Sequence, residues 1–257
     1  MKKYKSLGQH FLRDPQISQD MVARFINETP CKNVLEIGPG DGAITQFLLL
    51  HNDINYKIVE LDERLVQLHH KDPQRNHIEI IHCDFLKLNL RSVFDGSPFS
   101  IIGNFPYNIS SQIIFKILDT PQLVPYLVGM FQREFAMRVI SNSGHKDYGI
   151  PSVLTQYHYD CHHWFDIAPN LFEPPPKVWS TIISLNLKQE IRSDIDLSIF
   201  KRIVKATFNQ RRKMLRNTLR AVMNESQLKN PLIEKYLMLR PEQITLDDYM
   251  NIATICS

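Results

Sequence analysis

Five consecutive residues, Asn104-Phe105-Pro106-Tyr107-Asn108, combine groups suited to holding an amino group on a planar ring. Asn104 carries an amide oxygen that accepts a hydrogen bond from an exocyclic amine. Pro106 fixes the backbone, so nearby main-chain carbonyls keep one direction. Tyr107 offers an aromatic face on which a base can stack. The same residues also fit an ordinary strand-to-helix turn, so the rest of the chain decides between the two interpretations.

The elements that must position this segment are strands of an α/β sheet. The apolar run 98–103 predicts a buried strand that delivers Asn104 to its carboxyl end, where open α/β sheets bind ligands. Three earlier predicted strands also end at or next to a glycine or an acid. They cover residues 34–37, 56–61 and 77–82, and the residues at their ends are Gly38, Glu60 and Asp84. Four such features on one edge are more specific than any one of them.

The first of these features is a glycine-rich turn, Glu36-Ile-Gly-Pro-Gly-Asp-Gly42, between a strand and a helix predicted from about 43 to 50. Its spacing differs from the dinucleotide fingerprint, and Pro39 and Asp41 disfavour a pyrophosphate. A compact nucleoside without phosphates fits better. Glu60 follows Gly38 by 22 positions, about where Rossmann-type sites hold ribose hydroxyls.

Two further side chains complete the candidate site. Asp84 fits an acceptor for an adenine amino group, and it also fits an ordinary capping aspartate. The proline-rich segment 172–178 orders its loop cheaply and can hold Phe172 as a second stacking face. A loop stiffened by prolines around a buried phenylalanine is the alternative.

A metal site is weighed and disfavoured. His158, Cys161, His162 and His163 are ligand types, but a strand over 157–164 would point neighbours to opposite faces, and no second ligand cluster exists. We therefore expect no metal.

Composition fits a soluble globular protein of one large domain, or one domain with a small one. The 257 residues are 43% hydrophobic and 22% charged. The four cysteines are scattered and lack a C-x-x-C pair, which favours reduced thiols in the cytoplasm. The start lacks the apolar region of a signal peptide, and no run is long enough to cross a bilayer.

Charge is uneven although the net value is only +3. Residues 1–13 hold four basic residues and no acid, and residues 200–220 hold eight and no acid, which favours a polyanionic partner. A polar stretch near 188–196 predicts a boundary between a domain of residues 1–188 and a helical domain of residues 189–257. Phosphate contacts are expected from Arg211, Arg212, Lys213 and Arg216 on a basic helix.

Five motifs together resemble the bacterial small-subunit rRNA adenine N6,N6-dimethyltransferases, the family whose loss confers kasugamycin resistance. The motifs lie at residues 8–12, 36–42, 104–110, 172–178 and 208–217, so the resemblance covers nearly the whole chain. It implies a Rossmann-like class I S-adenosylmethionine-dependent methyltransferase sheet with a small all-helical C-terminal domain. It further implies dimethylation of two adjacent adenosines in a hairpin loop near the 3′ end of 16S rRNA. The expected setting is the 30S subunit in the cytoplasm during its biogenesis, with the enzyme as a monomer.

The resemblance also assigns residues. It implies that the cofactor contacts His10, Leu12, Gly38, Glu60, Asp84 and Asn104, and that Asn104, Pro106, Tyr107 and Phe172 act on the adenine. Two positions depart from the common family pattern: His10 stands where asparagine is frequent, and Phe105 where leucine is frequent. A main-chain contact at either position would survive the change.

Three other functions remain as alternatives. A macrolide-resistance-type dimethylase of the large subunit would share the sheet motifs, but residues 108–110 and 211–213 favour the small-subunit family. A non-catalytic ribosome-assembly or transcription factor would keep the fold, yet Glu60, Asp84, Asn104 and Tyr107 are intact. A DNA adenine methylase is disfavoured because no separate base-reading domain is visible.

Overall fold

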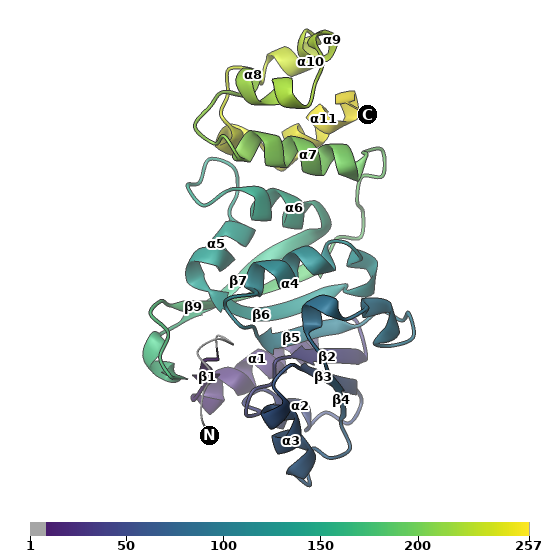
Figure 1. Cartoon of the computed structure of the whole chain (residues 1–257), viewed down its shortest axis with the longest axis vertical. Coiled ribbons are helices and arrows are strands. Elements are labelled where there is room, and N and C mark those ends of the chain that lie inside the picture. Colours follow the sequence, from purple (N-terminus) through teal and green to yellow (C-terminus); the bar gives the residue numbers. More distant parts are fainter. Residues whose placement is uncertain (1–8, 257) are drawn as a thin grey trace. The chain divides into compact units, whose positions relative to one another are not determined.

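The computed structural model describes residues 9–256, which form two compact units (Figure 1). Within the described range, the first unit holds residues 9–136 and 160–187, and the second holds 137–159 and 188–256. Residues 137–159 thus belong to the helical second unit, although they precede the domain boundary that the sequence predicts at residue 188. Whether the two functional domains divide at residue 188 stays a prediction. Gly8 and the basic residues of the N-terminus before it lie outside the described residues.

The first unit is built on a seven-stranded sheet with the order β4-β3-β2-β5-β6-β9-β7. The strands are β2 (Asn33–Ile37), β3 (Asn55–Glu60), β4 (Glu79–His82), β5 (Ser100–Asn104), β6 (Tyr126–Gln132), β7 (Tyr159–Ile167) and β9 (Ser180–Leu187). The run from β4 to β6 is parallel, and β9 pairs antiparallel with β6. The predicted α/β sheet is confirmed, with each predicted strand of residues 34–104 present within about two residues.

Helices connect these strands. They are α1 (Pro15–Glu28), α2 (Thr45–Leu48), α3 (Glu63–Lys71), α4 (Ser110–Ile117) and α5 (Arg133–Ile140). The start of α1 is fixed by Asp14, whose carboxylate accepts from the backbone N–H groups of Gln16 and Ile17, with Pro15 in the first turn. The helix predicted at 43–50 is shorter than expected, because turns occupy residues 40–44 before α2 begins.

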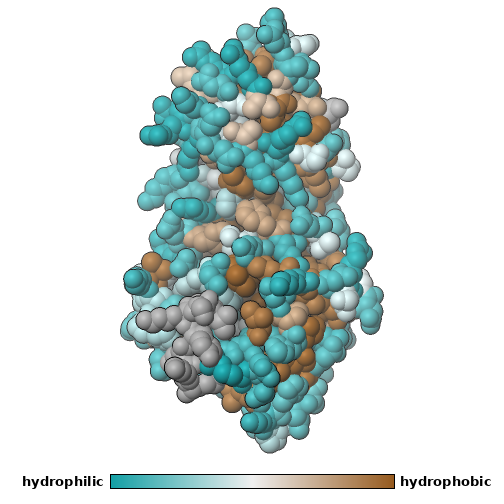
Figure 2. Space-filling view, viewed as in Figure 1, coloured by the Kyte–Doolittle hydropathy of each residue, from teal (hydrophilic) through white to brown (hydrophobic). Residues whose placement is uncertain are grey.

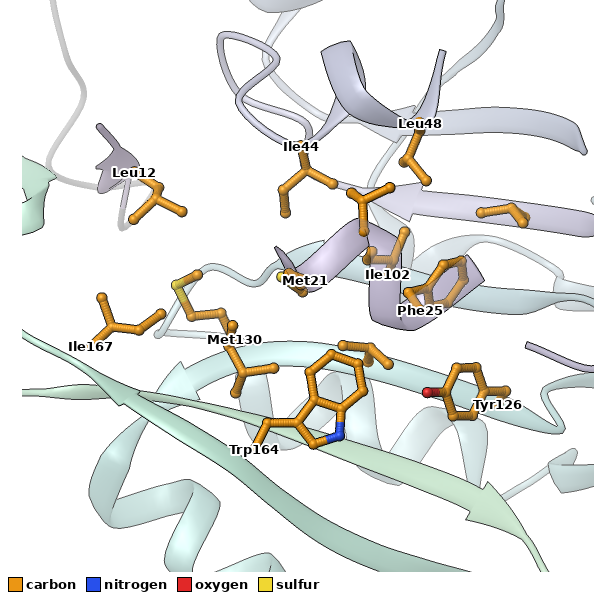
Figure 3. Close-up of a cluster of buried hydrophobic side chains, with 14 of the residues drawn as sticks. Leu12, Met21, Phe25, Ile44, Leu48, Ile102, Tyr126, Met130, Trp164 and Ile167 are labelled. Atoms are coloured by element: carbon orange, nitrogen blue, oxygen red, sulfur yellow. The ribbon is translucent and has the colours of Figure 1, made fainter. Parts of the chain in front are cut away.

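A cluster of buried hydrophobic side chains lies between α1, α2 and the sheet (Figure 3). Met21 and Phe25 of α1 face Ile102 of β5 and Met130 of β6, and all four are completely buried. Trp164 of β7 joins them and donates its indole N–H to Ser184 Oγ at 3.1 Å. Burial of this apolar surface stabilises the sheet on which the strand-end residues stand.

Phe105 is wedged between two strands directly after β5. Its ring is so close to Gly129 of β6 that a Cβ there would lie 2.2 Å from a ring carbon, and one at Gly103 would lie 2.8 Å away. Glycine is therefore required at both positions to admit the ring. The buried Phe105 fixes the neighbours on either side, Asn104 and Pro106, relative to the sheet.

A two-stranded sheet joins distant parts of the first unit. β1 (Phe11–Leu12) pairs antiparallel with β8 (Phe172–Glu173), with Leu12 opposite Phe172. Arg13 N–H continues the pairing by donating to the Leu171 carbonyl at 2.8 Å. This pairing places the segment that starts at Gln9 beside the proline-rich segment.

The second unit is helical apart from its connecting loops. Its elements include α6 (Ile150–His158), α7 (Leu197–Phe208), α8 (Leu215–Thr218), α9 (Glu225–Leu228), α10 (Pro231–Glu234) and α11 (Leu246–Cys256). A capping box precedes the last helix: Asp248 N–H donates to Thr245 Oγ1 at 3.1 Å, and Thr245 N–H donates to Asp248 at 3.2 Å. The first part of the 157–164 segment, predicted as strand, instead completes α6.

The surface is mainly hydrophilic on the face shown in Figure 2, with hydrophobic residues gathered over the sheet region of the first unit. Among residues 9–256 there is no helix with the length and apolarity needed to cross a membrane.

Candidate active site

One cavity of the first unit opens at the carboxyl ends of β2, β3, β4 and β5. Its wall contains most of the predicted site residues, namely His10, Leu12, Gly38, Glu60, Asp84, Asn104, Pro106 and Tyr107. The structure therefore brings the six residues predicted to contact a cofactor, and three of the four predicted to act on a base, to one place.

The glycine-rich turn forms one wall of this cavity. Gly38, Gly40 and Gly42 have φ angles of 64°, 61° and 96°, a left-handed region that favours glycine. A Cβ on Gly40 would lie 3.0 Å from the ring of Phe11 on β1. Gly38 and Gly40 line the cavity and have no side chains of their own, so a ligand can approach the backbone there closely.

Two side chains that sequence reasoning missed hold this turn from α3 and the loop after it. His69 Nε2 lies 3.0 Å from the Gly40 carbonyl, and Arg75 donates to the Asp41 carbonyl at 3.0 Å. Asp72 pairs with Arg75 at 2.9 Å. No sequence pattern marks these contacts, because they depend on how the α3 segment folds back over the turn.

Glu60 stands at the end of β3 with its carboxylate held by backbone. Its Oε1 accepts the N–H groups of Leu61 and Asp62, both at 2.8 Å. Burial raises the pKa of Glu60, and the two backbone hydrogen bonds oppose that rise. The carboxylate is therefore fixed in direction at the cavity wall.

Asp84 is a capping residue that also lies in the cavity wall, and its contact with an adenine amino group stays a prediction. Its Oδ1 accepts the Leu86 N–H at 2.9 Å and caps the short turn at 85–87, while the residue also lines the cavity. Nearby, Gln9 Nε2 donates to Asp62 at 3.0 Å, which ties the start of the described chain to the loop after β3.

The side-chain amide of Asn104 is oriented by the N-terminal segment. Its Nδ2 donates to the main-chain carbonyl of His10 at 2.8 Å, so the amide oxygen is left to face the cavity. The imidazole of His10 lies 5.3 Å from the ring of Tyr107 at an interplanar angle of 27°, and its Nδ1 lies 2.7 Å from the Pro174 carbonyl. His10 thus links three of the sequence motifs.

Tyr107 and Pro106 have defined partners. The Tyr107 hydroxyl hydrogen bonds with Ser180 Oγ of β9, and burial raises the pKa of Tyr107. The Pro106 carbonyl accepts both Ile109 N–H and Ser110 Oγ at 3.1 Å. Ser110 is the type of residue that often caps a helix, but here it is the first residue of α4 and its hydroxyl donates back to the Pro106 carbonyl.

Phe172 is not brought to the cavity. Its side chain is 3% exposed and belongs to the buried cluster with Leu12, and the ring is absent from the cavity wall among the described residues. Its packing matches the alternative of a buried phenylalanine under stiffening prolines. A stacking role for Phe172 stays a prediction and requires the ring to leave this cluster.

Glu36 is a buried acid in the cavity wall to which the sequence reasoning gave no role. Thr45 Oγ1 donates to its carboxylate at 2.8 Å, and the Tyr56 hydroxyl donates to the same oxygen. Burial raises the pKa of Glu36 to about 7, against the effect of these two hydrogen bonds. Its place as the first residue of the E-x-G-x-G-x-G pattern was the available signal.

The four basic residues predicted to contact phosphates lie in the second unit, but not on one helix. α7 ends at Phe208, so Arg211, Arg212 and Lys213 occupy the following turn, and the expected continuous basic helix is wrong. Arg212, Lys213 and Arg216 are exposed. Arg211 lies 3.6 Å from Glu242 and 3.4 Å from the His145 carbonyl.

The histidine-rich segment forms no metal centre in the structure. Within residues 9–256 there is no group of three or more side chains placed to hold a metal ion. His158 ends α6 and is buried, which lowers its pKa to about 4, whereas His163 on β7 pairs with Asp166 at 3.0 Å.

Comparisons with known proteins agree with this geometry. The family model for ribosomal RNA adenine dimethylase matches residues 1–256. A protein of Bacteroides thetaiotaomicron named ribosomal RNA small subunit methyltransferase A is 42% identical over 254 residues, covering 98% of this chain and 93% of the relative. A protein of Cytophaga hutchinsonii with the same name is 41% identical, covering 100% of this chain and 98% of the relative.

Solved structures show the same fold. A dimethyladenosine transferase from Plasmodium falciparum superposes with a TM-score of 0.77 at 23% identity, covering 95% of this chain and 96% of that one. The 23S rRNA methyltransferase ErmE superposes with a TM-score of 0.68 at 25% identity, covering 95% of this chain and 99% of that one.

Proposed function

Because this chain belongs to the ribosomal RNA adenine dimethylase family, we propose that it dimethylates N6 of two adjacent adenosines in a hairpin loop near the 3′ end of 16S rRNA. It is an S-adenosylmethionine-dependent methyltransferase of class I fold. The observation that carries the proposal is the orientation of Asn104: its amide nitrogen is engaged by His10, so its oxygen is left as an acceptor in the cavity.

The cavity fits S-adenosylmethionine. Gly38 and Gly40 line the cavity without side chains of their own, and the fixed carboxylate of Glu60 suits the two ribose hydroxyls. Asp84 suits the adenine amino group, while His10, Leu12 and Asn104 border the remaining wall. When bound, the cofactor supplies a methyl group on a positively charged sulfur, which an amine can accept.

Asn104 and its neighbours make adenine N6 a better nucleophile. The lone pair of N6 is delocalised into the ring, so the amine must become more tetrahedral to attack. Asn104 Oδ1 would accept one N6 hydrogen and the main-chain carbonyl of Phe105 the other. The Pro106 carbonyl already accepts two hydrogen bonds, which favours Phe105 for this role. Holding the amine in this orientation supplies several kcal/mol of barrier lowering.

The same arrangement permits a second transfer to the same nitrogen. After the first methylation N6 keeps one hydrogen, which Asn104 Oδ1 can accept while the lone pair again faces the donor. The extra proton of each step leaves to solvent. No strong base lies among Asn104, Pro106 and Tyr107, and the reaction needs none once the amine is oriented.

The target adenine must leave its stack to reach this site. Tyr107 would stack on the flipped base, with its ring held by the Ser180 hydrogen bond on one side and by His10 on the other. Adenosines in an exposed RNA loop unstack at low cost, which suits a hairpin target. Phe172 would add a second face only if it leaves the buried cluster.

The second unit would grip the RNA around the target. Arg212, Lys213 and Arg216 are exposed cations that suit phosphate contacts. We expect the substrate to be the 30S subunit, the site of action to be the cytoplasm, and the enzyme to act as a monomer during small-subunit biogenesis.

Large-subunit dimethylation is the nearest rival, since the fold is shared with ErmE. The relatives named for the small subunit are 41–42% identical over nearly the whole chain, against 25% for ErmE. This difference favours the small subunit. A purely structural assembly role is disfavoured by the intact set of Glu60, Asp84 and Asn104 in one cavity.

The test is methyl transfer from labelled S-adenosylmethionine to three substrates: 30S subunits from a strain lacking the enzyme, 50S subunits, and duplex DNA. Label recovered as dimethyladenosine in 16S rRNA alone supports the proposal. Label only in 23S rRNA would keep the chemistry and overturn the substrate. Binding of 30S subunits without label would instead favour an assembly factor.

A further inference from the structure

Trp179 is an exposed aromatic residue to which the proposed reaction assigns no role. Its side chain is 51% exposed, and among residues 9–256 it is the one aromatic residue in the set of exposed large hydrophobic side chains. An exposed indole loses the burial that normally stabilises such a side chain. A ring of this size at the surface is available for a partner to cover.

The position of Trp179 in the chain places its backbone near the active site. The next residue, Ser180, hydrogen bonds with the hydroxyl of Tyr107. Because consecutive Cα atoms are about 3.8 Å apart, the backbone of Trp179 lies within roughly 12 Å of the Tyr107 ring. That distance is spanned by one or two nucleotides of an RNA strand whose target base has entered the site.

The backbone of Trp179 is held in place. Arg133 N–H donates to the Trp179 carbonyl at 2.9 Å and extends the antiparallel pairing of β6 and β9 by one residue. Three prolines at 174–176 precede it and stiffen the loop. A tryptophan has only two side-chain torsions, so little conformational entropy is lost when such a ring is covered.

The surroundings of Trp179 fit a nucleic acid. Lys177 is exposed two residues earlier, and Arg133, the cross-strand neighbour, keeps about half of its side chain exposed while its Nε pairs with Asp166. An exposed ring together with cations on neighbouring residues of the chain and of the paired strand matches the bases and phosphates of a single RNA strand. Phe172, the other candidate for stacking, is buried and presents no face.

We propose that Trp179 binds the rRNA substrate by stacking on an unpaired base one or two nucleotides from the target adenosine. This inference rests on the proposed function and adds a substrate-binding residue outside the cavity. The stacked base would hold the RNA strand beside the site while Tyr107 receives the target base. Trp179 touches neither the cofactor nor the reacting nitrogen, so it should affect recognition of RNA rather than methyl transfer itself.

Steady-state kinetics on 30S subunits test the stacking. Removal of a stacking ring costs about 1–3 kcal/mol per base, so Trp179→Ala should raise KM for 30S subunits roughly 5- to 150-fold. The KM for S-adenosylmethionine should stay unchanged, and Trp179→Phe should recover most of the loss. Trp179→Leu keeps an apolar side chain without an aromatic face and should behave like Trp179→Ala. The matched control is Val178→Ala, an exposed apolar neighbour that should leave both KM values unchanged.

Fluorescence gives a second readout that does not require turnover. The chain has two tryptophans, and Trp164 is buried at 9% exposure, so quenching caused by a bound RNA reports on Trp179. Addition of 30S subunits should quench the wild-type signal, and Trp179→Phe should abolish the quenching.

Three results would overturn the stacking while leaving the methylation intact. They are an unchanged KM in Trp179→Ala, an activity of Trp179→Leu equal to that of wild type, and no quenching on binding. Wild-type activity of Trp179→Leu would indicate a ribosomal protein surface rather than a base. Failure of the proposed function has a different signature, since the wild-type enzyme itself would then leave 16S rRNA unlabelled.

Discussion

The side-chain amide of Asn104 donates to the main-chain carbonyl of His10 across 94 positions of sequence. This one hydrogen bond decides which end of the amide faces the cavity. It also explains why a histidine can replace asparagine at position 10, since the carbonyl that orients Asn104 is present in every residue type.

Replacement of Asn104 by aspartate should abolish most of the activity. The variant keeps the shape but loses the N–H groups, so a carboxylate oxygen would face the His10 carbonyl and turn the side chain away. We expect kcat to fall at least roughly 100-fold, as for a misoriented reactant. Label transfer to 30S subunits measures the loss. Asn33→Asp is the matched control. Asn33 makes the same kind of amide–carbonyl hydrogen bond, to the Pro98 carbonyl at 3.1 Å, but at the opposite end of the strands. Equal losses of activity in both variants would contradict the role assigned to Asn104.

Replacement of Glu60 by glutamine should weaken cofactor binding. The variant retains an acceptor for the backbone but loses the charge that strengthens hydrogen bonds to ribose hydroxyls. Hydrogen bonds to charged groups contribute about 1.5–3 kcal/mol, so Kd for S-adenosylmethionine, measured by calorimetry, should rise roughly 10- to 150-fold. Glu79→Gln on the neighbouring strand, an exposed partner of Lys57, should leave Kd unchanged. A Glu60 variant that binds as well as wild type would remove Glu60 from the site.

Stability should depend on pH through Glu36. Burial raises its pKa in the folded protein to about 7 from the usual value of 4.5, so between these values the native state binds more protons than the unfolded state. The free energy of unfolding contributed by this group therefore falls as pH rises from about 4.5 to 7, by roughly 3 kcal/mol in all. Urea unfolding of wild type and Glu36→Gln at pH 5 and pH 8 measures it. The glutamine variant should gain stability relative to wild type at the higher pH, and parallel pH curves would show that Glu36 does not titrate in this range.

Replacement of Gly42 by alanine should lower the free energy of unfolding by more than the backbone strain at its positive φ angle alone would cause. The added Cβ would lie 2.2 Å from the Arg75 guanidinium, which is held by Asp72 and the Asp41 carbonyl. Gly96→Ala is the control, since its φ of 81° carries similar strain while nothing lies within 4 Å of the new Cβ. We expect the control to lose about 1–2 kcal/mol of unfolding free energy. Gly42→Ala should lose more and should also bind S-adenosylmethionine more weakly. Equal losses would mean that Arg75 gives way freely.

Replacement of Arg212 by alanine should weaken RNA binding without loss of stability, because its side chain is exposed. For each phosphate that the variant no longer neutralises, the slope of log affinity against log salt should decrease by about 0.7–0.9. Affinity for 30S subunits over a series of salt concentrations measures this slope. Lys71→Ala, an exposed cation of the first unit, should leave it unchanged. An unchanged slope in the Arg212 variant would place the RNA elsewhere.

The strands and the shared edge could be predicted because they depend on local patterns. Apolar runs ending in Gly38, Glu60, Asp84 and Asn104 specify both the strand and the place where it stops. The glycines of the turn were visible for the same reason, since their φ angles require the residue type.

The remaining features depend on contacts between distant segments. His69 and Arg75 support the turn only because α3 folds back over it, and the hydrogen bonds of Glu36 come from Tyr56 and Thr45 on other elements. The burial of Phe172 and the exposure of Trp179 could not be predicted for the same reason. Both belong to the short segment between β7 and β9, but pairing of β1 with β8 helps to bury Phe172, while Trp179 stays exposed.

Leu12 and Ile44 are shared by the hydrophobic cluster and by the wall of the cavity. A molecule that fills the cavity therefore rests directly on the core that holds the first unit together. Inhibitor discovery can exploit this coupling: compounds that occupy the site should raise the melting temperature, so a thermal-shift screen would find them without any assay of methylation.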